Sequence, residues 1–454
     1  MSRLSWRRSA GAAAACALLC AGAPTAVAAD LADAWQQAQQ TDPSLRAAQS
    51  ALLAGREKAV QGDALLRPQL ALSAGLSRLD ERSGAALPAP LAELVKSSGS
   101  GTVQQAALQL EQPLYDRRSA AERDQLHEQS AIAELLFRDR QQQLIQDVGE
   151  AYFDLLLAQE SLQVTRSERA AVTMQRDRAQ ARFDVGRGKI TDLQEAQARL
   201  DGVAAREVSA ASRLALAEAR YQELTGAPGE GLAPLRPQWQ PAMPQPDSLA
   251  AWQARGLDGN TRVLLRQREL AIAGHETRKT ALESRPTVDL VASYAFKNGS
   301  GSLSPLAAPD HARSAAIGLQ FNVPLYAGGG IDSRRRESLA RREQAVHELA
   351  AAQRDARLQV QDAFLSVNTG VARIGALEQS LASARTALEA TTLGRDVGTR
   401  TELDVLDAQQ RLYAAQLDLA QARHDYLLGR LKLAAATGEL HEGELLALNA
   451  YLVR

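Results

Sequence analysis

The sequence carries one motif twice, and this duplication constrains the fold more than any other feature. The first copy reads Val-Gly-Arg-Gly-Lys-Ile-Thr-Asp over residues 185–192, and the second reads Val-Gly-Thr-Arg-Thr-Glu-Leu-Asp over residues 397–404. Each copy lies between two long stretches of helical pattern, so each copy predicts the tip of a helical hairpin. A chain with two such tips is expected to consist of two similar halves.

Other short segments recur in the same order, which extends the duplication over most of the chain. The matching pairs are Ala34-Trp35 with Ala251-Trp252, Arg67-Pro68 with Arg285-Pro286, Pro113-Leu114-Tyr115 with Pro324-Leu325-Tyr326, and Leu224-Thr225-Gly226 with Ala436-Thr437-Gly438. A proline-rich stretch separates the halves, and proline at this density is incompatible with a helix. We therefore expect a first repeat over 30–226, an extended linker over 227–247 and a second repeat over 248–454.

The N-terminus predicts a secretory signal peptide over residues 1–29. Arg7 and Arg8 form a basic start, an apolar stretch follows, and small residues precede the expected cleavage site near Ala29. Both cysteines, Cys16 and Cys20, lie within this segment. The mature protein is therefore expected to contain no disulfide, no metal thiolate and no catalytic thiol.

Composition and charge narrow the classes of function. The formal net charge is −1, and this near-neutral balance argues against nucleic acid as a partner. Aromatic residues make up 4% of the chain, and the abundance of Ala, Gln, Leu and Arg is typical of long helices. The mature sequence contains no apolar stretch long enough for a transmembrane helix. If this chain crosses a membrane, we expect it to do so as a closed β-barrel.

Three helical patterns are expected in each repeat. They are an opening helix over about 31–66 and 248–284, a very long helix over about 117–184 and 331–396, and a returning helix over about 191–224 and 401–436. Each very long helix would span about 100 Å, with apolar residues at a seven-residue spacing that is typical of a coiled coil. Helices of this length need packing partners along their whole length, so we expect the chain to oligomerise.

One pair of strands is expected in each repeat, between the opening helix and the very long helix. Apolar and polar residues alternate there, and the apolar set includes Leu70, Leu72, Leu76, Leu108, Leu110, Val288, Leu290, Tyr294, Phe296, Ile317, Leu319 and Phe321. This alternation fits a surface sheet, or barrel strands with lipid outside and water inside. A strand length of about 10 residues favours the barrel, with connecting loops over about 78–102 and 297–314. Because four strands are too few to close a barrel, several chains would have to share it.

Several of these segments resemble the TolC family of outer-membrane channels for efflux and type I secretion. The resemblance is strongest over residues 397–449, which contain Val-Gly-Thr-Arg-Thr, Leu-Asp-Val-Leu-Asp-Ala and the final Glu-Leu-Leu-Ala-Leu-Asn. It also covers Arg182-Phe183, Val185-Gly186 and Ile190-Thr191-Asp192. The repeats, the strand pairs and the tips agree with the family in order and spacing.

The resemblance implies an α+β membrane protein that works as a homotrimer. Four strands per chain would join in one shared β-barrel in the outer membrane of a Gram-negative bacterium, and the coiled helices would form an α-barrel in the periplasm. The trimer would contact outer-membrane lipid and would provide an exit duct for type I protein secretion, multidrug efflux or both. A periplasmic adaptor and an inner-membrane ABC or RND transporter would open its periplasmic end. No enzymatic activity, cofactor or metal is implied.

Asp404 and Asp407 lie at the start of a helix, on one face. Spacing by itself favours helix capping, because acidic residues suit a first turn and Thr401 with Asp404 matches a capping box. The resemblance instead implies that both aspartates line the narrow periplasmic entrance and make it cation-selective. Glu195 occupies the position of Asp407 in the first repeat, and it either adds a third acidic layer or is solvated surface.

The resemblance also implies a lock that holds the two tips together in the closed state. Thr191 and Asp192 match one side of this lock and Arg400 matches the other, so an Asp–Arg ion pair is expected. The family pattern has a tyrosine where this chain has Arg395. Arg395 would either bind Asp192 as well or repel Arg400 and loosen the lock.

The tips are expected to contact the adaptor, through Val185-Gly186 and Val397-Gly398. Their glycines are also typical of a plain turn at a helix C-terminus, and both interpretations are compatible.

Two alternatives from other classes remain. A periplasmic adaptor or coiled-coil scaffold would share the signal peptide and the hairpins, but it would not need two strand pairs or a duplication of the whole chain. A diffusion porin would need many more strands per chain and would have no use for such long helices.

Overall fold

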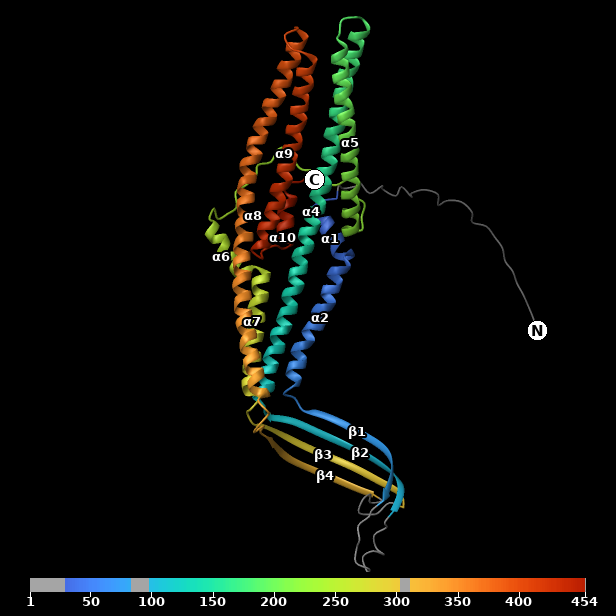
Figure 1. Cartoon of the computed structure of the whole chain (residues 1–454), viewed down its shortest axis with the longest axis vertical. Helices are drawn as coiled ribbons and strands as arrows, with labels where there is room; N and C mark the ends of the chain where they lie inside the picture. Colours follow the sequence, from blue (N-terminus) through green and yellow to red (C-terminus); the bar gives the residue numbers. More distant parts are fainter. Residues whose placement is uncertain (1–28, 83–97, 303–310, 454) are drawn as a thin grey trace, which may run out of the picture.

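The computed structural model of the chain describes residues 29–82, 98–302 and 311–453. Apart from Ala29, the expected signal peptide lies outside these residues. The molecule is elongated, with a sheet at one end and the two helical hairpin tips at the other (Figure 1).

Two helices run from the sheet to the tips. They are α4 (Arg117–Asp184), with 68 residues, and α8 (Gly330–Asp396), with 67 residues. The returning helices, α5 (Ile190–Thr225) and α9 (Glu402–Ala436), run back from the tips and end near the middle of the molecule (Figure 1). At 1.5 Å per residue each long helix spans about 100 Å.

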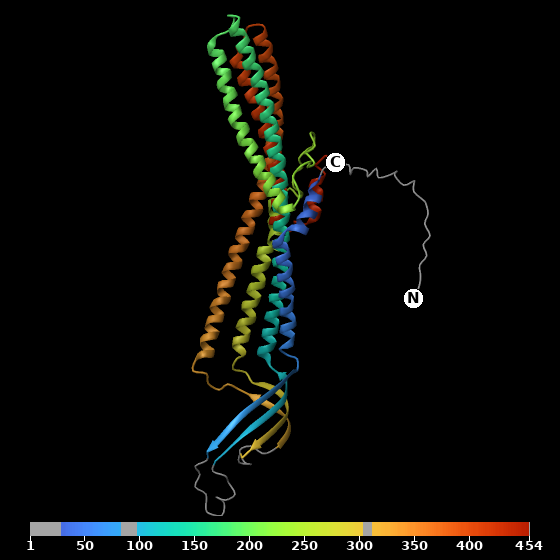
Figure 2. The ribbon, with the colours of Figure 1, turned by 90° about the vertical axis from the view of Figure 1, so that its right-hand side faces the viewer.

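The half nearer the sheet is completed by two further helices, α2 (Pro43–Ala64) and α7 (Thr261–Leu282). Here the helices contact one another in the order α2, α4, α7, α8, whereas towards the tips the order is α5, α4, α9, α8. The helices nearer the sheet therefore form a wall that is one helix thick (Figure 2).

The opening helix of each repeat is broken in two, and the expectation of one continuous helix was wrong in both repeats. The first repeat has α1 (Leu31–Thr41) before α2, and the second has α6 (Leu249–Gly259) before α7. Asp42 and Asn260 have extended backbones and cap the helix that follows, and Pro43 takes the first position of α2, where its missing N–H costs nothing. A residue that caps the next helix cannot continue the previous one.

Hydrogen bonds at these two breaks also join helices end to end. The Asn260 side chain donates a hydrogen bond to the carbonyl of Ala436, at the end of α9 (2.9 Å), and the Thr41 hydroxyl donates one to the carbonyl of Thr225, at the end of α5 (3.2 Å). In this way α9 continues into α7, and α5 into α2, without a covalent connection.

The sheet has four antiparallel strands in sequence order, β1 (Gln69–Arg82), β2 (Ser98–Tyr115), β3 (Thr287–Gly301) and β4 (His311–Asn322). The strands extend into the segments expected to be loops. Backbone pairing continues there through small residues, for example between Gly101 and Gly301. The remaining parts of those loops, 83–97 and 303–310, lie outside the described residues.

The strand register places the expected apolar residues on one face. One cross-strand row contains Leu72, Leu108, Tyr294 and Ala315, and another contains Leu70, Leu110, Ala292 and Ile317. Polar residues such as Ser73, Gln109 and Ser293 occupy the opposite face. Leu72 is 74% exposed and Ile317 is 77% exposed, so nothing in the described part of the chain covers the apolar face. None of the described helices combines the length and the apolar character needed to cross a bilayer.

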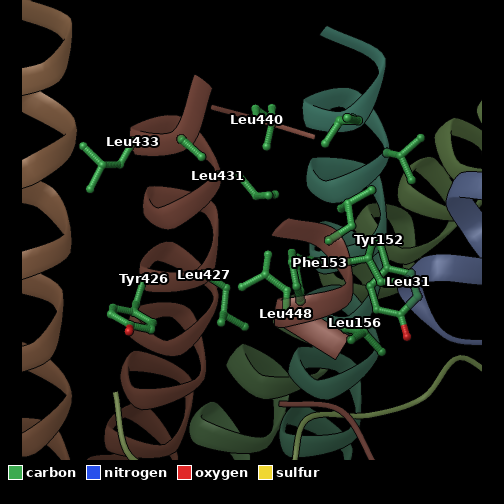
Figure 3. Packing of buried hydrophobic residues seen from close by; sticks show 14 of the residues in the cluster. Leu31, Tyr152, Phe153, Leu156, Tyr426, Leu427, Leu431, Leu433, Leu440 and Leu448 are labelled. Carbon is green, nitrogen blue, oxygen red and sulfur yellow. The ribbon is translucent and has the colours of Figure 1, made fainter. Parts of the chain in front are cut away.

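The hydrophobic core lies at mid-length, where both repeats meet the linker. Figure 3 shows Tyr152 and Phe153 of α4 near Leu448 of α10 (Glu442–Asn449). The Tyr152 hydroxyl donates hydrogen bonds to the carbonyls of Ala29 (3.2 Å) and Ala233 (3.0 Å). The N-terminus and the linker are thereby bound to the central helices.

The repeat symmetry provides a matched test of the joint between α9 and α7. Gly226 and Gly438 occupy equivalent positions and both have a φ of 73°. A Cβ at Gly438 would lie 1.9 Å from the carbonyl oxygen of Gly259, whereas a Cβ at Gly226 would lie 3.1 Å from a Thr41 methyl group. Gly226→Ala should destabilise the protein by about 1–2 kcal/mol through the left-handed backbone. Gly438→Ala should cost roughly another 1–3 kcal/mol through the clash.

Thermal or urea unfolding of the two purified variants in detergent measures this difference. Equal losses of stability would contradict the close backbone contact between Gly438 and Gly259.

Candidate functional site at the hairpin tips

Both tips have the same backbone geometry. The N–H of Gly186 donates to the carbonyl of Phe183 (2.9 Å) and the N–H of Arg187 donates to that of Arg182 (2.8 Å), which is the Schellman pattern of a helix C-terminus. Gly186 and Gly398 have φ angles of 70° and 82°, which glycine adopts without strain. Val185 and Val397 precede these glycines, and both are exposed at the ends of the molecule.

Asp404 and Thr401 form the capping box that their spacing predicts. The Asp404 carboxylate accepts hydrogen bonds from the Thr401 backbone N–H (2.8 Å) and hydroxyl (2.9 Å), and the Asp404 N–H donates to the Thr401 hydroxyl (3.1 Å). These bonds from Thr401, followed by the nearby charges of Arg400 and Arg411, lower the pKa of Asp404. The carboxylate therefore stays ionised at a lower pH than an ordinary aspartate.

Asp407 lies one turn further along α9 and is paired across the two hairpins. Its carboxylate accepts a hydrogen bond from the guanidinium of Arg199 on α5, and Arg199 also binds Gln410. No local sequence pattern indicated Arg199 as the partner of Asp407. Glu195, by contrast, is exposed on α5.

Glu402 is the central residue of the tip region, although the sequence analysis assigned it no role. Its side chain is 10% exposed and binds Arg182 of α4 (3.0 Å) and Arg395 of α8 (3.4 Å). An acidic residue in a first helical turn is expected from the helix dipole whether or not it has a partner. Sequence position therefore did not distinguish Glu402 from a solvated cap.

Arg395 is also nearly buried, with a side chain that is 8% exposed. It binds Asp396 (2.6 Å) and Glu402, and it donates a hydrogen bond to Gln175 of α4 (3.4 Å). Burial lowers the pKa of Arg395, but the hydrogen bonds and charges of Asp396 and Glu402 outweigh burial and raise it overall. Arg395 is therefore a permanent cation in this cluster.

Apolar contacts support the ion pairs. Val172 of α4, Ala196 and Val203 of α5, and Leu406 of α9 form a small buried cluster near the tips. Within one chain, the two hairpins are thus joined by this cluster and by the ion pairs of Glu402 and Asp407. We call these contacts the tip junction.

The expected lock residues form no ion pair with one another within one chain. Among the described residues of one chain, no ion pair joins Asp192 to Arg400 or to Arg395. Asp192 lies on α5, whereas the helices that meet across the tip junction are chiefly α4 and α9. Thr191 and Arg400 are exposed. Within one chain, the partners of Arg395 are Glu402, Asp396 and Gln175, and Asp192 is not among them.

Comparison with known proteins gives consistent results. The model of the family described as outer membrane efflux protein matches residues 34–227 and 269–439. Outer membrane protein TolC of Vibrio cholerae is 33% identical over 425 residues, covering 93% of this chain and 94% of the relative. Alkaline protease secretion protein AprF of Pseudomonas aeruginosa is 29% identical, covering 91% and 85% respectively.

Solved structures agree at the level of the fold. The outer membrane channel CmeC of Campylobacter jejuni has a TM-score of 0.77 at 15% identity, covering 92% of this chain and 89% of CmeC. The predicted fold class, with long coiled helices and four strands per chain, is confirmed.

Proposed function

Because the chain belongs to the outer membrane efflux protein family, we propose that three copies of it form one continuous duct across the outer membrane and the periplasm. The predicted function as an outer-membrane channel for efflux or secretion is confirmed by this membership, and so is the predicted localisation, with the helices in the periplasm. The trimer, its cargo, its partners and its gate are proposals.

The observation that carries the proposal is the matching order of strands and helices. The sheet order β1, β2, β3, β4 matches the order α2, α4, α7, α8 in the wall, and each strand is directly connected along the chain to the corresponding helix. The unpaired edges are therefore β1 with α2 on one side and β4 with α8 on the other. A neighbouring copy that pairs along this edge extends the sheet and the wall together.

The edge helices α2 and α8 have exposed apolar residues that a neighbouring copy would cover. Leu53 and Val60 of α2, and Leu339, Val346 and Leu365 of α8, are exposed in the single chain. Seven-residue steps within these sets are the spacing of a coiled-coil seam. With four strands from each of three copies, the barrel would have about twelve strands, above the minimum of about eight for closure.

The cargo is proposed from the names of the relatives. AprF is named for the secretion of alkaline protease, and TolC is named as an outer membrane protein. We infer type I protein secretion as the main role, with multidrug efflux as an added one. An adaptor that contacts Val185, Gly186, Val397 and Gly398 would connect the duct to an inner-membrane ABC or RND transporter.

The tip junction supports a gate at the periplasmic end. Within one chain, Glu402 holds α4 and α8 to the start of α9, and Asp407 holds α5 to α9. The ion pairs of Glu402 and Asp407 do not include Thr191, Asp192 or Arg400. We propose that these three residues link neighbouring copies. Opening then requires the hairpins to separate, which breaks the bonds of Glu402.

The acidic residues near the gate would select cations. Asp404 is half-buried on α9, its capping bonds keep it ionised, and Asp407 follows on the same helix. Three copies would bring six carboxylates around one axis, with Glu195 as a third layer. Arg199 neutralises part of this charge in the single chain, so Asp404 is expected to contribute most.

Planar-bilayer recording of the purified protein tests the proposal. We expect small, cation-selective channels that a trivalent cation blocks from the helical side, and Asp404→Ala with Asp407→Ala should abolish the block. Glu389→Ala is the matched control, because it removes an exposed carboxylate from α8 and should leave the block unchanged. If the folded protein forms no channel, the result would contradict the duct and favour the alternative function of a periplasmic adaptor or coiled-coil scaffold.

Glu402→Gln tests the gate. The variant leaves Arg395 buried beside one carboxylate instead of two, and it removes the tie to Arg182, so the closed state should lose stability. We expect mean single-channel conductance to rise by about two-fold or more. Glu389→Gln should match wild type, and an unchanged conductance in Glu402→Gln would show that the gate does not depend on the tip junction.

The lowered pKa of Asp404 predicts a pH dependence. Because the pKa of Asp404 is lowered from its ordinary value, the carboxyl keeps its charge, and the selectivity that depends on it, until the pH falls through this lowered pKa. Thr401→Val removes the hydroxyl bond, so cation selectivity should disappear at a higher pH than in wild type. Reversal potentials in a KCl gradient measure this change.

Thr399→Val is the control for this measurement, because the Thr399 hydroxyl binds the carbonyl of Gly394 (3.0 Å) and no carboxylate. Identical titration of the Thr401→Val variant and wild type would exclude the capping bond as the cause.

A further inference from the structure

Arginines occur at all four places where the chain passes between a helix and a strand. They are Arg67 between α2 and β1, Arg117 and Arg118 at the start of α4 after β2, Arg285 between α7 and β3, and Arg334, Arg335 and Arg336 near the start of α8 after β4. Figures 1 and 2 both place these four crossings at one level of the molecule. We call this set the arginine belt.

Most arginines of the belt form no ion pair within the described part of the chain. Arg334 forms ion pairs with Glu283 (2.7 Å), whereas no ion pair is found for the other six. Asp63 binds His127 (3.0 Å), and the nearby charge of Arg67 also acts on Asp63. Asp116 accepts hydrogen bonds from the N–H groups of the first turn of α4. Asp332 lies in the first turn of α8, where the helix dipole favours it. All seven arginines are exposed.

The belt also opposes local electrostatics. Arg117 and Arg118 are the first two residues of α4, whose first turn contains no acidic residue. The positive end of the helix dipole disfavours cations there. An anion supplied from outside the chain would offset this repulsion.

The belt lies where the apolar face of the sheet begins. Leu70 and Val288 are the first apolar residues of that face in β1 and β3, shortly after Arg67 and Arg285. Leu325 and Tyr326, between β4 and α8, are 92% and 89% exposed. Exposed Leu and Tyr beside Arg are typical of the boundary between hydrocarbon and lipid headgroups.

We propose that the arginine belt binds the phosphate groups of anionic phospholipids on the periplasmic side of the outer membrane. This inference rests on the proposed duct, whose strands cross the membrane and whose helices leave it at the belt. Guanidinium groups match phosphate oxygens in geometry, and several arginines at one depth act together on an anionic surface. Three copies would surround the barrel with a continuous basic ring that selects its lipid neighbours.

Native mass spectrometry of the purified trimer, incubated with equal amounts of phosphatidylglycerol and phosphatidylcholine, measures the preference. Wild type should retain phosphatidylglycerol in excess by on the order of ten-fold. The quadruple variant Arg117→Gln, Arg118→Gln, Arg335→Gln, Arg336→Gln should lose this excess. The control, Arg178→Gln, Arg213→Gln, Arg357→Gln, Arg385→Gln, removes the same charge from exposed helical positions away from the belt and should behave as wild type.

Equal retention by wild type and the belt variant would overturn the inference, and so would equal losses in the belt and control variants. Inorganic phosphate is tested separately: if it raises the thermal unfolding midpoint of wild type as much as phosphatidylglycerol does, the belt is a site for free phosphate. Conductance in planar bilayers is recorded for every variant. If wild type forms normal channels but shows no lipid preference, the proposed lipid binding by the arginine belt is refuted. If wild type forms no channels, the proposed duct is refuted.

Discussion

A wall that is one helix thick has no interior, and this constraint governs the structure. A helix in such a wall buries its apolar residues only against the helices beside it, so each needs neighbours over its whole length. Within one chain α4 and α7 have neighbours on both sides, whereas α2 and α8 leave apolar residues exposed at the edges. The sheet has the same property, because β1 and β4 end it without partners. Closure by copies of the chain, as proposed, would satisfy both edges at once.

Local signals in the sequence predicted most of the elements. Hydrophobic spacing indicated α4, α5, α8 and α9, alternation indicated the four strands, and the recurring Val-Gly motif indicated both tips. The breaks at Asp42 and Asn260 were missed because a capping residue inside a helical pattern resembles an ordinary polar position. The strand ends were missed because Gly and Ser suggested loops, whereas backbone pairing accepts them where the partner strand continues, as at Gly101 and Gly301.

The site was less predictable, for a physical reason. Capping of Asp404 by Thr401 depends on residues three apart, and spacing predicts it directly. The bonds of Glu402 with Arg182 and Arg395 depend on how two hairpins are rotated against each other, which no local pattern encodes. The Asp192–Arg400 pair inferred from the resemblance likewise depends on geometry between elements, and within one chain these two residues form no ion pair.

The end-to-end joints of α9 with α7 and of α5 with α2 have a mechanical consequence. Two of the four helical positions in the wall, α9 with α7 and α5 with α2, are interrupted at mid-length. Hydrogen bonds such as that of Asn260 with Ala436 hold the two helices of a pair together. A torque applied at the tips therefore reaches the sheet through the continuous helices α4 and α8, while the interrupted pairs turn at their mid-length joints. The end of the duct at the hairpin tips can then change its diameter while the strands of the sheet keep their register.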